Sequence, residues 1–312
     1  MIHAHKSPRP TRDMVRPTTL IEAPRLSKRL GLDLLLASET FQLTGSFKFR
    51  AAYNVAAQVP QERIVAASSG NFGQAMAYAC QLLGKSCIVV MPTTSAQVKI
   101  EAVREYGGLV DLVDVTTTSR KARVAELASQ YPDAYVASGY DDPLVIEGNS
   151  TLGLELGAIG RQFDFIIAPV GGGGLISGII KGLRTSSKQG EVLGAEPLLG
   201  NDAARSLRAG RIIANESEPQ TIADGARTIS LGQHNWAILR QGPFRIIEVP
   251  EERIKEGVSL LFSLANLKAE PTGALGIGAL LTEPGLFRDR SVCCVVSGGN
   301  VDPNVFRKIL GD

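Results

Sequence analysis

The strongest constraint on the fold is a regular alternation of short apolar runs, rich in β-branched residues, with longer stretches of helical periodicity. The runs that predict strands lie at 34–37, 64–67, 87–91, 110–115, 165–170, 192–195, 245–249 and 292–297. Helices are predicted at 46–58, 72–83, 96–106, 119–130, 144–160, 175–184, 252–267 and 273–281. Nearly continuous apolar strands separated by helices are typical of parallel sheets covered on both faces. The sequence therefore predicts an α/β fold.

Composition and charge argue against several classes of protein. The chain has 33 Lys and Arg against 31 Asp and Glu, and a formal net charge of +2 gives no field to attract nucleic acid. Four cysteines without metal-binding or disulfide spacing indicate buried thiols in a reducing compartment. Residues 1–8 lack the apolar core of a signal peptide, and the most apolar window, 165–180, is broken by Pro169 and four glycines. We therefore expect a soluble, cytoplasmic protein with no nucleic-acid or membrane partner.

A glycine-rich segment follows the strand predicted at 165–170 and precedes a helix. It contains Gly171, Gly172, Gly173 and Gly174. Free backbone N–H groups at the start of a helix attract an anion, and the helix dipole adds to that attraction. Leu175 and Ile176 follow where a Walker loop requires lysine and serine or threonine, and the glycine spacing of a dinucleotide site is also absent. A monophosphate site is favoured over a simple turn, for which two glycines would suffice.

Three further polar segments lie where strands end or helices begin. In the first, Ser46 is the predicted N-cap and Lys48 lies in the first helical turn. Lys48 is either merely exposed or an amine that attacks a carbonyl, with the dipole supplying part of the lowered pKa that this requires. The segment 68–74 suits a carboxylate or phenolate oxygen, or is an ordinary N-cap. The segment Ser297-Gly298-Gly299-Asn300 suits a flat ligand with a ring nitrogen, or is only a turn.

Taken in this order, the Ser-Phe-Lys, Ser-Gly-Asn, tetraglycine and Ser-Gly-Gly-Asn segments resemble those of one family. It is the family of pyridoxal-phosphate (PLP) enzymes of the tryptophan synthase β fold, fold type II, in the branch of threonine/serine dehydratases and serine racemases. The resemblance runs from about Arg16 almost to the C-terminus. It implies a large PLP-binding domain of residues 1–62 and 141–312 and a small, mobile, substrate-side domain of residues 63–140. Each is a mostly parallel twisted sheet flanked by helices, and a homodimer is implied.

The resemblance also implies roles for individual residues. Lys48 is similar to the lysine that bonds to PLP and removes the Cα proton, and Ser69 to the serine that acts on the opposite face in racemases. The implied cofactor-binding residues are Lys48, Asn71, Gly171, Gly172, Gly173, Gly174 and Ser297. The implied substrate-binding residues are Ser68, Ser69, Gly70, Asn71, Gln74 and Arg120. A Mg²⁺ or Ca²⁺ site of two carboxylates and a carbonyl is implied at Glu196, Gly200 and Asp202, although surface acids on a loop are the alternative.

The reaction that follows from the resemblance is a PLP-dependent elimination, that of a carbon–oxygen lyase. A β-hydroxy L-amino acid such as threonine or serine would give a 2-oxo acid and ammonia. Ser297 is a neutral partner for the ring nitrogen, which favours prompt elimination over transamination. A racemase with side eliminase activity is the main alternative, since Ser69 supplies a second acid–base group; a β-replacing synthase and a non-catalytic ligand-binding homologue are others. Phe72 replaces a histidine common in the family and leaves the substrate's identity open.

Overall fold

The computed structural model describes residues 10–68, 70–95, 97–185, 190–242 and 244–311. Two separate sheets are present in these residues, in the strand orders β1-β2-β10-β7-β8-β9 and β5-β4-β3-β6. The strands of the first sheet are β1 (Thr19–Glu22), β2 (Asp33–Ser38), β7 (Phe165–Pro169), β8 (Glu191–Pro197), β9 (Arg245–Val249) and β10 (Ser291–Val296). Those of the second are β3 (Arg63–Ala67), β4 (Ser86–Pro92), β5 (Leu109–Val113) and β6 (Tyr135–Ala137).

Helices separate the strands throughout, as the alternation predicts. The helices up to the end of the second sheet are α1 (Thr11–Met14), α2 (Pro24–Leu30), α3 (Lys48–Gln58), α4 (Asn71–Leu83), α5 (Gln97–Glu105) and α6 (Arg120–Gln130). Those that follow are α7 (Pro143–Gly157), α8 (Gly174–Leu183), α9 (Asp202–Ala209), α10 (Gln233–Leu239), α11 (Glu251–Ala265), α12 (Leu275–Thr282), α13 (Pro284–Phe287) and α14 (Pro303–Leu310). Short 3-10 helices are η1 (Leu198–Gly200), η2 (Asp224–Ala226) and η3 (Thr272–Ala274).

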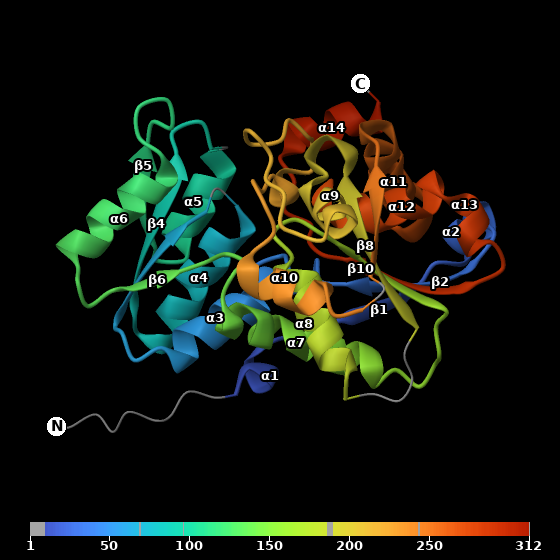
Figure 1. The fold of residues 1–312 in the computed structure, drawn as a ribbon, viewed down its shortest axis with the longest axis horizontal. Coiled ribbons are helices and arrows are strands. Elements are labelled where there is room, and N and C mark those ends of the chain that lie inside the picture. The colour runs from blue at the N-terminus through green and yellow to red at the C-terminus, as the bar shows by residue number, and fades with distance from the viewer. Residues whose placement is uncertain (1–9, 69, 96, 186–189, 243, 312) are drawn as a thin grey trace.

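The α/β class and the parallel sheets are confirmed. All strand pairs of the described residues are parallel except β1 with β2. Strand β1 has no predicted counterpart because it is a short edge strand whose side chains are only partly buried. The two sheets lie side by side, and α11 and α12 cover one face of the larger sheet while α7 and α8 cover the other (Figure 1). The smaller sheet is made wholly of residues between Arg63 and Ala137; the exact domain boundaries remain a prediction.

The middle strand of the larger sheet explains the burial of two cysteines. Strand β10 pairs with β2 on one side and β7 on the other. Its adjacent residues Cys293 and Cys294 are fully buried in two different hydrophobic clusters, one on each face of the sheet. Burial raises the pKa of both thiols.

No helix among the described residues has the length and apolar character needed to cross a membrane.

Candidate active site

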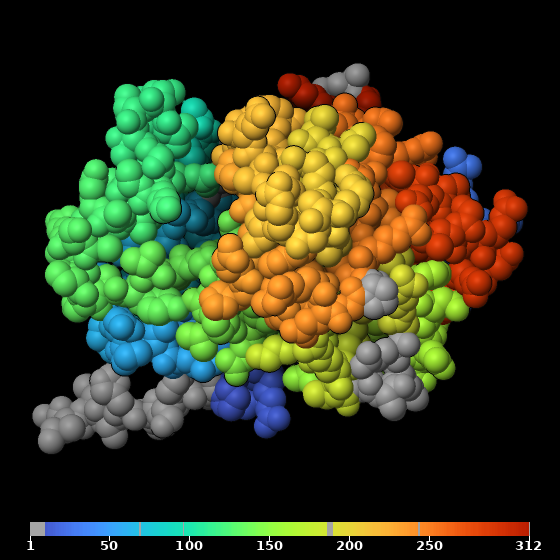
Figure 2. Space-filling view, viewed as in Figure 1, coloured from blue at the N-terminus to red at the C-terminus, as the bar shows by residue number. Residues whose placement is uncertain are grey.

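A cavity of about 820 Å³ lies between the two sheets, lined by strand ends of the smaller sheet and by segments next to the larger one, such as Ser297 directly after β10. In Figure 2 the green segments of the smaller sheet face the yellow and orange segments 211–232 across this part of the molecule. Six of the twelve predicted catalytic, cofactor and substrate residues come together on its wall. These are Lys48, Ser68, Gly70, Asn71, Arg120 and Ser297. Ser69 lies outside the described residues, and Gln74 is buried away from the cavity wall.

Lys48 is the first residue of α3, so its position in the first helical turn is confirmed. The predicted N-cap at Ser46 is wrong: Phe47 precedes the helix without a capping side chain, because Ser46 forms an antiparallel bridge with Gly298. The Lys48 amine donates a hydrogen bond of 2.7 Å to the carbonyl of Gly139. Burial lowers the pKa of the amine to about 8, although the nearby Glu270 carboxyl opposes this shift.

Two aromatic rings lie close to this buried amine. The Lys48 amine lies 5.0 Å from the ring centroid of Phe47 and 5.7 Å from that of Phe72. Phe72 therefore supplies an apolar wall beside the amine where a histidine would supply a polar group. Apolar surroundings favour the neutral form of an amine, and a neutral amine is the form that attacks a carbonyl.

Helix α3 is held in place by a buried ion network around Arg50, two residues after Lys48. The Arg50 guanidinium is fully buried and contacts Glu39 at 2.7 Å and Glu155 at 2.7 Å. These partners lie after β2 and on α7, so the network joins three elements around the start of α3. Breaking a buried network of this kind costs about 3–5 kcal/mol, because one charge is left unpaired.

The loop before α4 presents polar groups to the same cavity. The Ser68 hydroxyl accepts hydrogen bonds from the N–H groups of Gly70 at 3.3 Å and Gly73 at 3.0 Å. Asn71 is the first residue of α4 and donates its side-chain N–H to Glu270 at 2.7 Å. A helix start with short polar side chains suits an anionic oxygen.

Glu270 is a site residue that the sequence analysis missed. It lies between β10 and η3 in space, is 2% exposed and lines the cavity. Burial raises the pKa of its carboxyl to about 8, with a further increase from Asp224 and an opposing effect of Lys99. No local pattern around Glu270 marks it as a site residue, because its contacts come from segments distant in the sequence.

Ser297 follows β10 directly and lies next to the lysine in space. Its carbonyl accepts a 3.0 Å hydrogen bond from the N–H of Phe47, the residue before Lys48. The side chain is 1% exposed and faces the cavity. The segments around Lys48 and Ser297, some 250 positions apart in the printed sequence, are thus hydrogen-bonded neighbours.

The four glycines lie behind Tyr140. Gly173 has φ +95° and is the N-cap of α8, which begins at Gly174. A Cβ on Gly172 would lie 2.1 Å from the Tyr140 ring, so this ring rests directly on the glycine loop. Asn235 holds the arrangement, since its amide donates to the carbonyls of Tyr140 at 2.9 Å and Gly172 at 2.8 Å. The loop does not itself line the cavity, but Tyr140 does.

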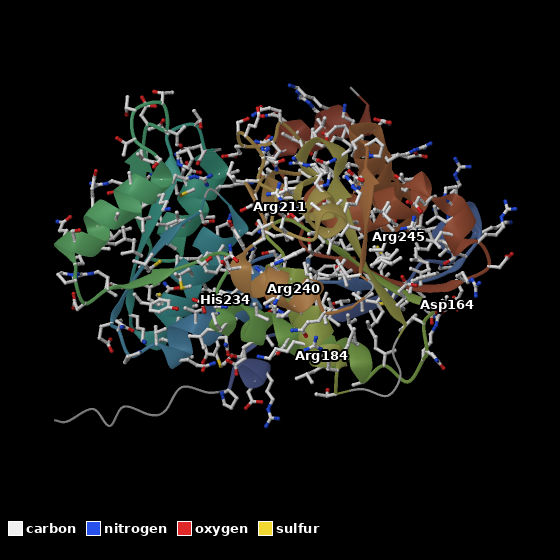
Figure 3. The ribbon with its side chains drawn as sticks, viewed as in Figure 1. Asp164, Arg184, Arg211, His234, Arg240 and Arg245 are labelled. Atoms are coloured by element: carbon white, nitrogen blue, oxygen red, sulfur yellow. The ribbon has the colours of Figure 1, made fainter. Side chains whose placement is uncertain are left out.

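The segment that carries Tyr140 connects the amine to the glycine loop. The Lys48 amine contacts Gly139, and the next residue, Tyr140, contacts Gly172. Asp141 then accepts hydrogen bonds of 2.9 Å from the first N–H groups of α10, including that of His234; Figure 3 labels His234 at this end of α10. The amine and the predicted anion site therefore lie on either side of one short, anchored segment.

Two ion pairs join the smaller sheet to the larger one at the cavity. Arg120, at the start of α6, contacts Glu218 at 3.0 Å. Lys99 on α5 pairs with Asp224 in η2. These four residues line the cavity. Partly exposed pairs of this kind contribute little to stability, about 0–1 kcal/mol each, so their carboxylates can be exchanged for those of a ligand.

The predicted metal residues lie apart from the cavity, at the ends of β8 and η1. Glu196 accepts hydrogen bonds of 2.9 Å from the N–H groups of Ala203 and Ala204. Burial and the proximity of Asp202 raise the pKa of Glu196, and burial raises that of Asp202 to about 7. One oxygen of Asp202 is buried and has no hydrogen-bond partner among the described residues. No cluster of three or more His, Cys, Asp or Glu side chains that could hold a metal is found in the described ranges. The predicted site has only two acidic side chains and one backbone carbonyl, so it is not a cluster of that kind.

The cavity residues fit PLP by their chemistry. A desolvated amine suits its aldehyde carbon, an amide N–H its phenolic oxygen, and a neutral hydroxyl its ring nitrogen. The glycine loop lies outside the cavity, behind the Tyr140 ring that occupies the space above Gly172. Its backbone suits a phosphate, because the N–H groups at the start of α8 lack intrahelical acceptors.

Comparisons with known proteins agree with this chemistry. A family model described as "Pyridoxal-phosphate dependent enzyme" matches residues 11–298. The L-threo-3-hydroxyaspartate ammonia-lyase of Pseudomonas sp is 35% identical over 297 residues, which are 94% of this chain and 92% of the relative. Serine racemase of Homo sapiens is 34% identical, over 93% of this chain and 88% of the relative.

Solved structures are similar over almost the whole fold. The crystal structure of a threonine deaminase from T.th. matches with a TM-score of 0.87 and 39% identity, covering 93% of this chain and 94% of that chain. That of maize serine racemase matches with a TM-score of 0.89 and 30% identity, covering 95% of this chain and 92% of that chain.

Proposed function

Since the chain belongs to the pyridoxal-phosphate dependent enzyme family and has ammonia-lyases among its relatives, we propose that it is an ammonia-lyase for a β-hydroxy L-amino acid with a second carboxylate. The observation that carries the proposal is the cavity itself, which holds the Lys48 amine and the Arg120 guanidinium. Arg120 is already paired with the carboxylate of Glu218, so a substrate carboxylate can take the place of Glu218. The relatives named hydroxyaspartate ammonia-lyase support this choice of substrate class.

In this proposal Lys48 would hold PLP until the substrate amine replaces it, and the cofactor would supply an electron sink for the electron pair left on Cα. The released Lys48 amine is then free to act as the base. Lys48 removes the Cα proton, which its lowered amine pKa of about 8 allows near neutral pH. The N–H groups at the start of α4 hold the α-carboxylate together with Ser68. The β-hydroxyl leaves as water. Ser297 meets the ring nitrogen without a charge, which favours elimination.

Racemisation is the second activity we consider. Ser69 is the residue that favours it, because a hydroxyl opposite Lys48 would return a proton to the other face of Cα, and relatives named serine racemase support it.

We also propose that Glu196, Asp202 and the carbonyl of Gly200 bind Mg²⁺ or Ca²⁺ as a structural ion, since a cation would balance two buried acids. A homodimer in the cytoplasm completes the proposal.

The test is a substrate screen of the PLP-loaded protein with serine, threonine, phenylserine and L-threo-3-hydroxyaspartate. Ammonia, 2-oxo acid and the epimer of each amino acid are measured together. We expect the highest kcat/KM for 3-hydroxyaspartate. Arg120→Gln should lower that value at least tenfold, or about 1.4 kcal/mol, with little change for serine.

Arg123→Gln is the matched control, because Arg123 lies on the same helix but contacts Asp111 and Glu126 and does not line the cavity. Equal turnover of serine and 3-hydroxyaspartate, or equal losses in the two arginine variants, would contradict the assignment of the second carboxylate. Epimer without ammonia would favour the racemase.

A further inference from the structure

The side-chain amide of Asn71 is held from both ends. Its oxygen accepts a hydrogen bond of 2.8 Å from the Asn300 amide nitrogen, and its nitrogen donates one of 2.7 Å to Glu270. These partners come from two separate segments, the Ser-Gly-Gly-Asn loop and the segment before η3. An amide flipped by 180° has the same shape, so packing alone does not choose between its two orientations and hydrogen bonds must do so.

The orientation of Asn300 is itself fixed. Its nitrogen also donates to the carbonyl of Thr44 at 2.8 Å, and a carbonyl accepts only from an N–H. Gly45 has φ +72°, and a Cβ there would lie 2.3 Å from the Asn300 amide oxygen. The amide therefore lies directly on the Gly45 backbone, with its nitrogen toward Thr44 and Asn71.

Glu270 fixes the position of the nitrogen end of the Asn71 amide. Its side chain is buried between Asn71 and the backbone of Gly298, where a Cβ would lie 2.6 Å from the carboxyl oxygen that accepts from Asn71. The second carboxyl oxygen has no hydrogen-bond partner among the described residues. The Glu270 oxygen that accepts from Asn71 is thus held in a fixed position.

We propose that Asn300 and Glu270 are positioning residues that lock the Asn71 amide so that it offers N–H, and not C=O, to the cavity. The inference rests on the proposed function, in which Asn71 donates to the phenolic oxygen of PLP. With one N–H used by Glu270 and the oxygen used by Asn300, the amide has one N–H left for that role. If the Asn71 amide were flipped, its oxygen would face the Glu270 oxygen that now accepts from its nitrogen.

The test compares variants by the cofactor rather than by turnover. A pH titration of the visible absorption of bound PLP reports the pKa of the proton that its phenolic oxygen shares with the imine nitrogen, here called the phenolic pKa. The PLP dissociation constant and the melting temperature of the PLP-free protein are measured alongside. Asn300→Asp replaces the donor with an acceptor, and Glu270→Leu removes the other acceptor. Both should raise the phenolic pKa by about one unit and weaken PLP binding about tenfold, the effect of one lost hydrogen bond to an ionised oxygen.

Two matched variants separate orientation from charge and from folding. Glu270→Gln keeps an acceptor for Asn71 and should restore the parent titration. Asp302→Asn removes a charge two residues after Asn300 and keeps a capping side chain on α14, so it should leave the titration unchanged. Glu270→Leu removes no positive charge, so an electrostatic effect of this variant would lower the phenolic pKa or leave it unchanged, and would not raise it. If this variant does not fold, Asn300→Asp decides.

The outcomes distinguish this inference from the function on which it rests. A parent-like titration of Asn300→Asp, or a lowered pKa in Glu270→Leu, while Asn71→Ala raises the pKa, overturns the positioning role and leaves that of Asn71 intact. An unchanged titration of Asn71→Ala overturns both. Wild-type protein that never gains the visible band overturns the proposed function itself.

Discussion

At the scale of single residues, the site depends on polar groups removed from water. The aromatic rings of Phe47 and Phe72 lie near the Lys48 amine, and the carboxyl of Glu270 is buried beside it. Burial shifts the pKa of the amine down and that of the carboxyl up, and both shifts favour the neutral forms. A neutral amine and a neutral acid in one cavity are suited to proton transfer near neutral pH.

A pH dependence of cofactor capture follows from the lowered pKa of Lys48. The rate at which PLP-free protein bonds PLP should rise about tenfold per pH unit below about 8, where the neutral fraction of the amine grows, and level off above it. Stopped-flow absorbance between about pH 6 and 10 measures this rate, with Lys48→Ala as the control without specific capture. A rate that still climbs at about pH 10 would indicate an ordinary exposed lysine.

At the scale of elements, helix starts converge on the site. Helices α3, α4 and α8 begin at Lys48, Asn71 and Gly174. Each start carries free N–H groups and the positive end of a helix dipole, worth about 0.3–1 kcal/mol to a nearby anion. This arrangement suits a ligand with several anionic groups, as PLP with an amino acid has. The sheets supply it because successive helices begin near the carboxyl ends of parallel strands.

Gly173 provides a test of the anion loop at this scale. Gly173→Ala should lower the free energy of unfolding by more than the roughly 1–2 kcal/mol expected for a left-handed backbone alone, because its Cβ would lie 2.8 Å from that of Asn235. Gly210→Ala is the matched control, since Gly210 has φ +66° and open space around it.

Urea unfolding compares the stabilities of these two variants, and a PLP titration compares their affinities. We expect weaker PLP binding only in the Gly173 variant. Equal unfolding costs and parent-like PLP affinity in both variants would contradict the assigned role of the loop.

The fold was predictable from the sequence because its strands are apolar along their whole length, as in β10. Lys48, Asn71 and Ser297 were predictable because each lies in a recognisable motif. Glu270 was not, because its meaning depends on Asn71, 199 positions away in the chain. The position of Tyr140 over the glycine loop is likewise a product of tertiary packing, and local sequence carries no signal of it.

At the scale of the whole molecule, the cavity and the proposed cation site are separate features. The cavity lies between the sheets, whereas Glu196 and Asp202 are buried near the start of α9. A cation there would stabilise the larger sheet and the segments packed on it without taking part in the reaction. The ion pairs of Arg120 and Lys99 join the two sides of the cavity, together with the hydrogen bonds of Asn71 to Glu270 and Asn300.

Metal addition tests the cation site. Ca²⁺ or Mg²⁺ at one hundred times its dissociation constant should stabilise the protein by about 2.7 kcal/mol, which raises Tm by several degrees, and EDTA should reverse the change. Asp202→Asn should abolish the effect. Glu248→Gln on β9 is the control, because Glu248 is paired with Arg208. If the metal raises the Tm of Asp202→Asn as much as it raises that of the parent protein, the ion binds elsewhere.

The most direct test of the central claim is to locate the cofactor on the chain. PLP-loaded protein is treated with borohydride, which makes the bond between cofactor and amine permanent, and the modified peptide is identified by mass spectrometry. The account predicts one modified residue, Lys48, and no modification of the cavity's other lysines, Lys99 and Lys121. Modification of a different lysine, or none in protein exposed to PLP, would contradict it.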